Sequence, residues 1–276
     1  MPFTLSHVAA VVPLLGRGAE GCWVASGLVA GSMAPDVPYF ADSLLPGVYR
    51  FGALTHRWWA VPTVDAAIAA GGVVLWHGLL RDPLTGLLPE GLPVAVEAPL
   101  PRGAAGVGAF VLSAAVGAAS HVLWDAFTHP GRAGVRAVPV LGRPVAGDVP
   151  LCTVLQYGTS LLGLAVLGER VRRAARTPHA GPGPRRPRRA VRRAAVAGLA
   201  VSAALGAAHR LARRERGVVS EFCFGAGAGL AVGATVFAAL SAARARVPSA
   251  GTTPGAGRRS VRPSAAGRRC AGRAPR

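Results

Sequence analysis

The sequence predicts an all-α fold: a polytopic transmembrane helical bundle with about five to six spans, an Arg-rich linker and a disordered C-terminal tail. Of the 276 residues, 51% are hydrophobic and 16% are charged, and the mean hydropathy is +0.39. This balance is typical of a membrane protein. Several apolar stretches also approach the length of about 20 residues that a bilayer-spanning helix needs. The four cysteines are scattered and form no CxxC pair, which excludes a small disulfide-built domain.

The elements are expected in a simple order along the chain. The first apolar stretch, Cys22–Pro35, is too short to cross a bilayer and predicts a re-entrant or partly buried helix. Five longer stretches are predicted to span the membrane: Val64–Leu80, Ala104–Phe127, Val149–Gly168, Val191–Ala208 and Phe222–Ala243. Between the third and the fourth, the proline- and glycine-rich segment Thr177–Arg189 is typical of a linker. The tail from Pro248 to Arg276 is expected to be disordered.

These elements divide the chain into four parts. Residues 1–168 are predicted to form a membrane-embedded domain that carries a candidate metal site. Residues 169–190 form an Arg/Pro/Gly-rich linker, residues 191–243 a C-terminal transmembrane hairpin, and residues 244–276 a disordered basic tail.

The positive charge lies almost entirely in the second half of the chain. Residues 1–168 contain 8 Arg and 9 acidic residues, whereas residues 169–276 contain 23 Arg and 3 acidic residues. Nucleic-acid binding is one interpretation of such a basic region, but no binding module and no interleaved aromatic residues accompany it. We therefore expect no nucleic-acid partner. Arginine-rich segments next to apolar spans are typical of the cytoplasmic face of a multi-pass inner-membrane protein.

This interpretation fixes a topology. The 169–190 segment and the tail are placed in the cytoplasm, so the loop 128–148 and the residues before 64 face the other side. The loop 209–221 is the exception, because it holds four Arg and two Glu yet would face outward.

The segment Ser120–His129 carries the clearest candidate site. His121, Asp125 and His129 follow one another at intervals of four residues, which places them on one face of a helix. Imidazoles and a carboxylate so spaced can converge on one or two divalent ions such as zinc. The alternative is a buried polar stripe, or a His–Asp hydrogen bond between helices. Ionisable groups inside an apolar segment are costly, which favours a functional site.

Earlier motifs supply possible companions. His7 lies near the N-terminus, Asp36 follows a Pro at the end of the first apolar stretch, and His56 precedes the first predicted span. The first two spans should run antiparallel, so the start of the first and the end of the second lie at one membrane face. This geometry brings His56 close to Asp125 and His129.

Together these motifs resemble a known family. Met1–His7, Gly31–Asp36 with Tyr39 and Phe40, Thr55-His56, and Ser120–His129 resemble the bacterial domain-of-unknown-function family 4184 over most of residues 1–168 and into the later spans. That family is more distantly similar to the inner-membrane metal-dependent hydrolase-like family. Its ligand order also resembles that of the zinc-dependent phospholipase C and single-strand nuclease superfamily.

The resemblance implies roles for the candidate residues. Asp36, His56 and His121 would hold one metal ion. Asp125, the implied catalytic carboxylate, would bridge to a second ion that His7 also holds. The implied ligand set is His7, Asp36, His56, His121, Asp125 and His129.

The resemblance is incomplete at one point. His129 matches a ligand of a third zinc ion in the superfamily, but the later His-x3-Glu pair has no counterpart here. After His129 the remaining histidines are His179 in the linker and His209. The expected cofactor is therefore one or two divalent ions, with zinc as the expected metal.

The implied function is a membrane-bound metal-dependent hydrolase, phosphoesterase-like, that acts on a lipid-like substrate at the bilayer surface. Arg57 is the candidate substrate-binding residue, and its alternative is an interfacial arginine that extends toward water. Two other classes stay open. One is a non-catalytic integral membrane protein with a structural His/Asp cluster. The other is a transporter or channel, which is disfavoured because the ionisable groups gather at one face.

Overall fold

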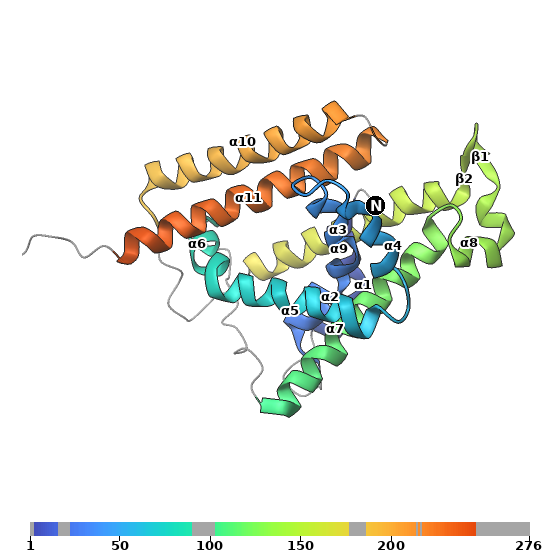
Figure 1. The fold of residues 1–276 in the computed structure, drawn as a ribbon, viewed down its shortest axis with the longest axis horizontal. Coiled ribbons are helices and arrows are strands. Elements are labelled where there is room, and N and C mark those ends of the chain that lie inside the picture. The colour runs from blue at the N-terminus through green and yellow to red at the C-terminus, as the bar shows by residue number, and fades with distance from the viewer. Residues whose placement is uncertain are drawn as a thin grey trace, which may run out of the picture.

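The computed structural model describes residues 3–15, 23–89, 103–176, 186–213, 215 and 217–246. These ranges are helical apart from turns and one short β-hairpin (Figure 1). The helices are α1 (Val8–Leu15), α2 (Ala25–Met33), α3 (Val37–Ala41), α4 (Gly52–Thr55), α5 (Ala66–Leu75), α6 (Arg81–Thr85), α7 (Gly103–Thr128), α8 (Ala133–Ala137), α9 (Leu151–Ala175), α10 (Arg189–Arg213) and α11 (Val218–Arg246). The antiparallel strands are β1 (Pro144–Ala146) and β2 (Val149–Pro150).

Short irregular helices connect several of these elements. 3₁₀ turns lie at Thr4–His7, Ala34–Asp36, Val48–Phe51 and Pro139–Gly142, and π-helical turns lie at Val61–Asp65 and Trp76–Leu80. The first π-helical turn leads into α5 and the second joins α5 to α6, which makes one continuous helix, Val61–Thr85.

Within the described ranges, five helices are long and apolar enough to cross a membrane. They are Val61–Thr85, Gly103–Thr128, Leu151–Ala175, Arg189–Arg213 and Val218–Arg244. Little of their surface is covered by the protein itself: in α10, only 11% of the most apolar window is buried. Apolar surface of this extent needs a lipid environment. The predicted all-α membrane bundle is therefore confirmed, with each span longer than predicted.

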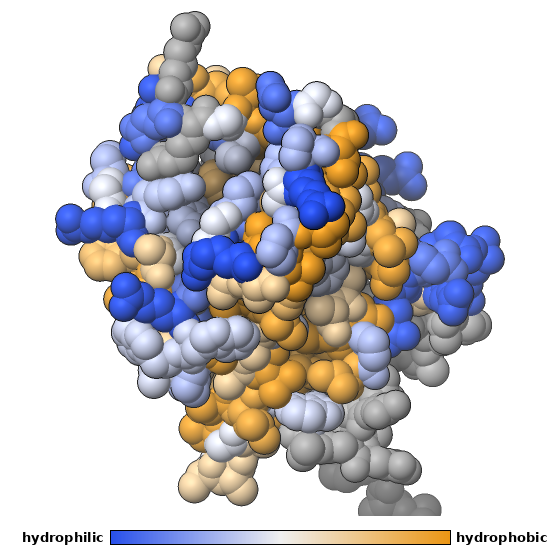
Figure 2. Space-filling model, turned by 90° about the vertical axis from the view of Figure 1, so that its right-hand side faces the viewer, coloured by the Kyte–Doolittle hydropathy of each residue, from blue (hydrophilic) through white to orange (hydrophobic). Residues whose placement is uncertain are grey.

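The spans alternate in direction, so the bundle has two distinct ends (Figure 1). The β-hairpin end gathers the last turns of α7 and α10 and the first turns of α9 and α11. Figure 2 faces this end and shows hydrophilic side chains spread among hydrophobic surface. The opposite, arginine-rich end carries these residues of α9 and α10: Arg170, Arg172, Arg173, Arg189, Arg192 and Arg193.

The short helix α2 packs very closely on α7 inside the bundle. A Cβ atom on Gly31 would collide with the carbonyl oxygen of Ala114, and one on Gly117 would collide with that of Leu28. Glycine at both positions therefore lets the two backbones touch. As a consequence, the end of α2 lies beside the last two turns of α7.

Helices α10 and α11 form a tight hairpin that docks on the rest of the bundle. Gly206 faces Gly225 and Gly229 across the hairpin with no room for a Cβ atom. At the arginine-rich end, Arg192 donates to the carbonyl oxygen of Leu87 at 2.9 Å. At the β-hairpin end, α11 packs on α3.

The boundaries of the predicted linker differ from the observed helices. Helix α9 continues to Ala175, and α10 begins at Arg189, so part of the predicted 169–190 linker is helical. Residues 177–185 and the predicted disordered tail from 248 to 276 lie outside the described residues. The division of the chain into four parts stays a prediction.

Candidate metal centre

The site is built around the last turns of α7. His121 and Asp125 lie one turn apart on a buried face of this helix, with 0% and 1% of each residue exposed. The helix ends at Thr128, because Pro130 has no N–H to continue it and Gly131 adopts a positive φ of 74°. His129 follows directly, and its N–H still donates to the carbonyl oxygen of Asp125. The predicted face of three residues is therefore present.

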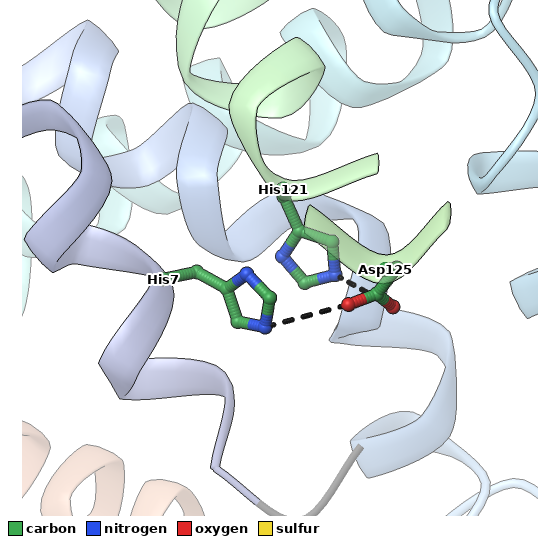
Figure 3. A group of neighbouring side chains, drawn as sticks. All are labelled: His7, His121 and Asp125. Carbon is green, nitrogen blue, oxygen red and sulfur yellow. Dashed lines mark ion pairs between the residues drawn. The ribbon is translucent and has the colours of Figure 1, made fainter. Parts of the chain in front are cut away.

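His7 reaches the same place from the N-terminal 3₁₀ turn. Its Nε2 atom lies 3.6 Å from Oδ1 of Asp125, and its ring stacks on that of His121 with centroids 3.9 Å apart. Figure 3 shows the three side chains pointing toward one another. Helix α1, which follows His7, is fixed by its packing against α2 and α9.

Asp36 and His56 complete the cluster from two further elements. Asp36 lies in the 3₁₀ turn after α2, where Oδ2 of its carboxylate accepts a hydrogen bond from the Thr4 hydroxyl at 2.5 Å. His56 follows α4, which is tied to the same turn because the Thr55 hydroxyl donates to the carbonyl oxygen of Pro35 at 2.6 Å. Both carry side chains with 0% exposure.

Four donor atoms converge at the centre of this cluster. Nε2 of His56 lies 3.7 Å from Oδ1 of Asp36 and 3.3 Å from Oδ2 of Asp125. Nε2 of His121 lies 3.5 Å and 3.6 Å from the same two oxygens. Tetrahedral zinc with bonds of about 2.0–2.1 Å separates its ligand atoms by roughly 3.3–3.4 Å. The four separations between a histidine nitrogen and a carboxylate oxygen are close to that value.

Two groups of three donors could each hold a metal ion. One consists of His7, His121 and Asp125, and the other of Asp36, His56 and His121; within each group, one donor atom from every residue lies within 4.8 Å of the others. Both groups are buried, and they share His121. Asp125 links them, because its Oδ1 faces His7 and its Oδ2 faces the two other histidines.

The hydrogen bonds around the cluster orient its imidazoles toward the centre. Nδ1 of His121 lies 2.8 Å from the carbonyl oxygen of Ser32, and Nδ1 of His56 lies 2.7 Å from that of Gly52. A carbonyl only accepts, so Nδ1 carries the proton in both rings and Nε2 presents its lone pair. This arrangement is typical of histidines that bind metal ions.

The atoms that face the centre accept or donate no hydrogen bond within the described part of the chain. Among the described residues, no hydrogen bond reaches the following buried atoms: Oδ1 of Asp36, Nε2 of His56, Nε2 of His121, and both carboxylate oxygens of Asp125. Buried polar atoms are normally hydrogen-bonded, and exceptions of this kind commonly mark ion sites. The donor set therefore fits a divalent cation.

Electrostatics keeps the outer histidines in the form that can bind a metal. Burial lowers the pKa of His7 to about 3, and the neighbouring His121 acts in the same direction. Burial also lowers the pKa of His129 to about 4, although the Asp125 carboxylate opposes the shift. Both imidazoles are therefore neutral near pH 7. Burial alone would raise the pKa of Asp36, but His121 holds it below its ordinary value.

All six predicted ligands lie in one place, whereas the predicted substrate residue does not join them. His129 is at the edge of the cluster, with Nδ1 3.7 Å from Oδ1 of Asp125 and 3.1 Å from the Thr128 hydroxyl oxygen. Arg57 is exposed next to His56. No ion pair or hydrogen bond within the described ranges connects the Arg57 side chain to the cluster. The roles of these residues in binding and catalysis stay predictions.

Sequence reasoning missed two neighbours of the cluster. Asp65 is fully buried in the first π-helical turn, interacts electrostatically with His121, and has no hydrogen bond to its carboxylate among the described residues. An acidic residue inside an apolar span is itself a signal, and it was available in the sequence. Tyr39 packs on the other side, with its ring centroid 5.6 Å from that of His56 and 5.5 Å from that of Phe224 in α11.

The family model for a domain of unknown function (DUF4184) matches residues 1–239 of the chain. No curated protein and no solved structure matches it. The matched range contains the six clustered residues, Tyr39 and most of the α10–α11 hairpin. The hairpin is therefore part of the same family unit as the cluster.

Proposed function

The chain belongs to the family of the domain of unknown function DUF4184, and we propose that it is a membrane-bound metal-dependent hydrolase that cleaves a phosphoester in a lipid-like substrate. One observation carries the proposal: two imidazole nitrogens and two carboxylate oxygens converge at 3.3–3.7 Å in a buried place where they have no other described partner. The order of these residues along the chain, which resembles that of zinc-dependent phospholipase C, supports a hydrolytic reaction.

The residues divide naturally between two ions. Asp36, His56 and His121 would hold the first, and Asp125 would share its carboxylate with a second beside His7. Neutral imidazoles and carboxylates are common zinc ligands, so zinc is the proposed metal. Such ions polarise a phosphoryl oxygen and make water a nucleophile near neutral pH.

The chain's own residues would arrange the reactants. One carboxylate oxygen of Asp125 faces His7 and the other faces His56 and His121. The Asp125 carboxylate can therefore accept a hydrogen bond from an attacking water molecule and orient that water. The carbonyl oxygens of Ser32 and Gly52 hold the two central imidazoles in one orientation. Side chains that are already held in this orientation do not have to move when charge develops during the reaction.

The surroundings of the cluster support a lipid-like substrate. Trp58 and Trp59, which follow His56 and Arg57, are 58% and 53% exposed. Leu44 and Leu45 in the nearby loop are 58% and 63% exposed. Exposed tryptophans and leucines near span ends are typical of the membrane–water boundary. We place the arginine-rich end in the cytoplasm of a cell with an inner membrane, so that the cluster lies toward the opposite face.

The proposal is tested on the full chain purified in detergent. We expect about one or two equivalents of zinc per chain and phosphodiesterase activity that a chelator removes. His121→Ala and Asp125→Asn should abolish both. His209→Ala is the matched control, because His209 is exposed and outside the cluster. Metal content that stays unchanged in both cluster variants would refute the proposal.

A second candidate is a structural ion in a non-catalytic membrane protein. The near-complete burial of five of the six side chains, at 0–2% exposure, favours it. In that case the wild-type chain would hold zinc and lose stability with chelator, but no phosphoester in a broad panel would be cleaved.

A further inference from the structure

Of the six clustered side chains, that of His129 is the most exposed. The side chains of His7, Asp36, His56, His121 and Asp125 are 0–2% exposed, whereas that of His129 is 17% exposed. His129 is therefore the edge of the cluster that is most accessible from outside, and we call its surroundings the opening of the site. What lies beside this residue decides which chemical group is admitted.

Arg132 lies at this opening. Its N–H donates to the carbonyl oxygen of His129 at 3.2 Å, and the turn between them depends on the positive φ of Gly131. Arg132 then precedes α8, which packs against the end of α7. The side chain is half-buried.

The charge of Arg132 is not neutralised by any carboxylate in the part of the chain that the structure describes. No carboxylate among the described residues lies within ion-pair distance of its guanidinium. Three other arginines at the β-hairpin end have partners within the protein. Arg210 and Arg213 pair with Asp42, and Arg136 donates to the carbonyl oxygen of Gly131. A half-buried guanidinium without an acidic partner is suited to an anionic ligand.

A second polar group lies near Arg132. The Tyr39 ring packs near His56, and its hydroxyl is close enough to the Arg132 guanidinium to feel its charge. Burial and the nearby Asp36 raise the pKa of Tyr39, whereas Arg132 acts in the opposite direction. Arg132 also contributes to the lowered pKa of His129. The same guanidinium therefore lies near both His129 and Tyr39, which come from different elements.

We infer that Arg132, together with the Tyr39 hydroxyl, is the anion-binding element of this site and holds the phosphate group of the substrate beside the metal cluster. The planar guanidinium can donate two parallel hydrogen bonds to phosphate oxygens, and the phenol can donate a third. The inference rests on the proposed function and assigns substrate binding to Arg132 in place of Arg57. It names the recognised group as a phosphate monoanion or diester.

The test is binding of inorganic phosphate to the zinc-loaded full chain in detergent, followed by calorimetry, with zinc content measured on every sample. We expect Arg132→Gln to weaken phosphate binding by about tenfold or more, as loss of a charge-assisted pair does. Tyr39→Phe should weaken it less, and Arg132→Lys should restore part of it. Arg143→Gln is the matched control, because Arg143 is exposed at the same end and its loss should change little. Arg57→Gln tests the competing assignment of substrate binding to Arg57.

The outcomes separate this inference from the proposed function. If Arg132→Gln binds phosphate as tightly as the wild type, or if Arg57→Gln carries the loss, the inference is wrong and the hydrolase proposal stands. If the wild type holds zinc but no phosphate, the inference is also wrong. If the wild type holds no zinc, the proposed function fails first. In a positive result, a steady-state assay on a short-chain phosphodiester should show a raised KM in Arg132→Gln with a smaller change in kcat.

Discussion

The guanidinium of Arg210 donates to Oδ2 of Asp42 at 2.9 Å, although 168 positions separate the two residues in the chain. Arg210 is fully buried and also donates to the Glu221 carboxylate at 2.5 Å. The other Asp42 oxygen accepts hydrogen bonds from the N–H groups of Gly47 and Tyr49 at 2.8 and 3.1 Å. These bonds join the α10–α11 hairpin to the loop after α3. Helix α3 carries Tyr39, whose ring packs beside His56 of the metal cluster.

Loss of this buried cation should strongly destabilise the protein. Arg210→Met removes the positive charge and leaves Asp42 and Glu221 buried together, which typically costs about 3–5 kcal/mol. We expect a large drop in the midpoint of unfolding in detergent, measured by circular dichroism. Arg143→Met, at an exposed position of the same end, is the control. Equal stability of the two variants would show that the network does not hold the hairpin.

Close packing of α2 on α7 should be needed for the cluster to form. Gly117→Ala pushes the new methyl group against the carbonyl oxygen of Leu28 and the nitrogen of Ser32. The carbonyl oxygen of Ser32 orients His121, so displacement of α2 should also separate Asp36 from His121. We expect a loss of about 1–3 kcal/mol in unfolding free energy, as overpacking causes, together with weaker zinc binding.

Gly108→Ala provides the matched control for this effect. Gly108 lies on the same helix, and no described atom lies within 4 Å of the place that its Cβ would occupy. Alanine there should be neutral or slightly stabilising, because it favours the helix. If the two alanine variants bind zinc equally well, close approach at Gly117 is not what positions the site.

Two features of the sequence predicted part of the site: the helical spacing of polar residues, and the antiparallel direction of consecutive transmembrane spans. Four-residue spacing placed His121, Asp125 and His129 on one helix face, because an α-helix repeats every 3.6 residues. Antiparallel spans placed His56 at the same end. For His7 and Asp36, resemblance supplied the roles, since no periodic pattern connects an N-terminal turn to a distant helix.

Other features left little trace in the sequence. The pairing of Arg210 with Asp42 depends on tertiary docking, so no local spacing predicts it. The loop 209–221 conflicted with the predicted topology because of its arginines. In the structure, Arg210 and Arg213 both pair with Asp42. Glu221 is a second partner of Arg210, and Glu215 is a second partner of Arg213. Helix α9 runs past its predicted end because Arg and Ala favour helices, and because Glu169 pairs with Arg172 one turn later.

The metal-free protein should lose stability as the pH falls below about 6.5. In the unfolded chain, His7 and His129 titrate near 6.5, whereas in the folded protein burial lowers the pKa to about 3 for His7 and about 4 for His129. Protons therefore bind the unfolded state more strongly in this range. The contribution of the two residues is complete above about 6.5 and is lost as the pH falls toward 4 and then 3.

This pH dependence is measured by thermal unfolding of chelator-treated protein between pH 7.5 and pH 4, conditions chosen to bracket these values. The double variant His7→Gln, His129→Gln should show a shallower decline than the wild type, because glutamine does not titrate. Parallel curves for the two proteins would contradict the assignment of these histidines as buried and neutral.

Removal of His56 should weaken zinc binding more than removal of His7. Nε2 of His56 lies 3.7 Å from a carboxylate oxygen of Asp36 and 3.3 Å from one of Asp125, whereas Nε2 of His7 lies 3.6 Å from a carboxylate oxygen of Asp125 alone. After dialysis against a weak chelator, we expect His7→Ala to retain about one equivalent of zinc and His56→Ala to retain clearly less, because His56 faces both carboxylates and His7 faces one. His77→Ala, on the first span away from the cluster, should match the wild type. Equal zinc retention by His7→Ala and His56→Ala would mean that the group around His56 is not the tighter site, because the ligand that faces more donor atoms should matter more to the bound ion.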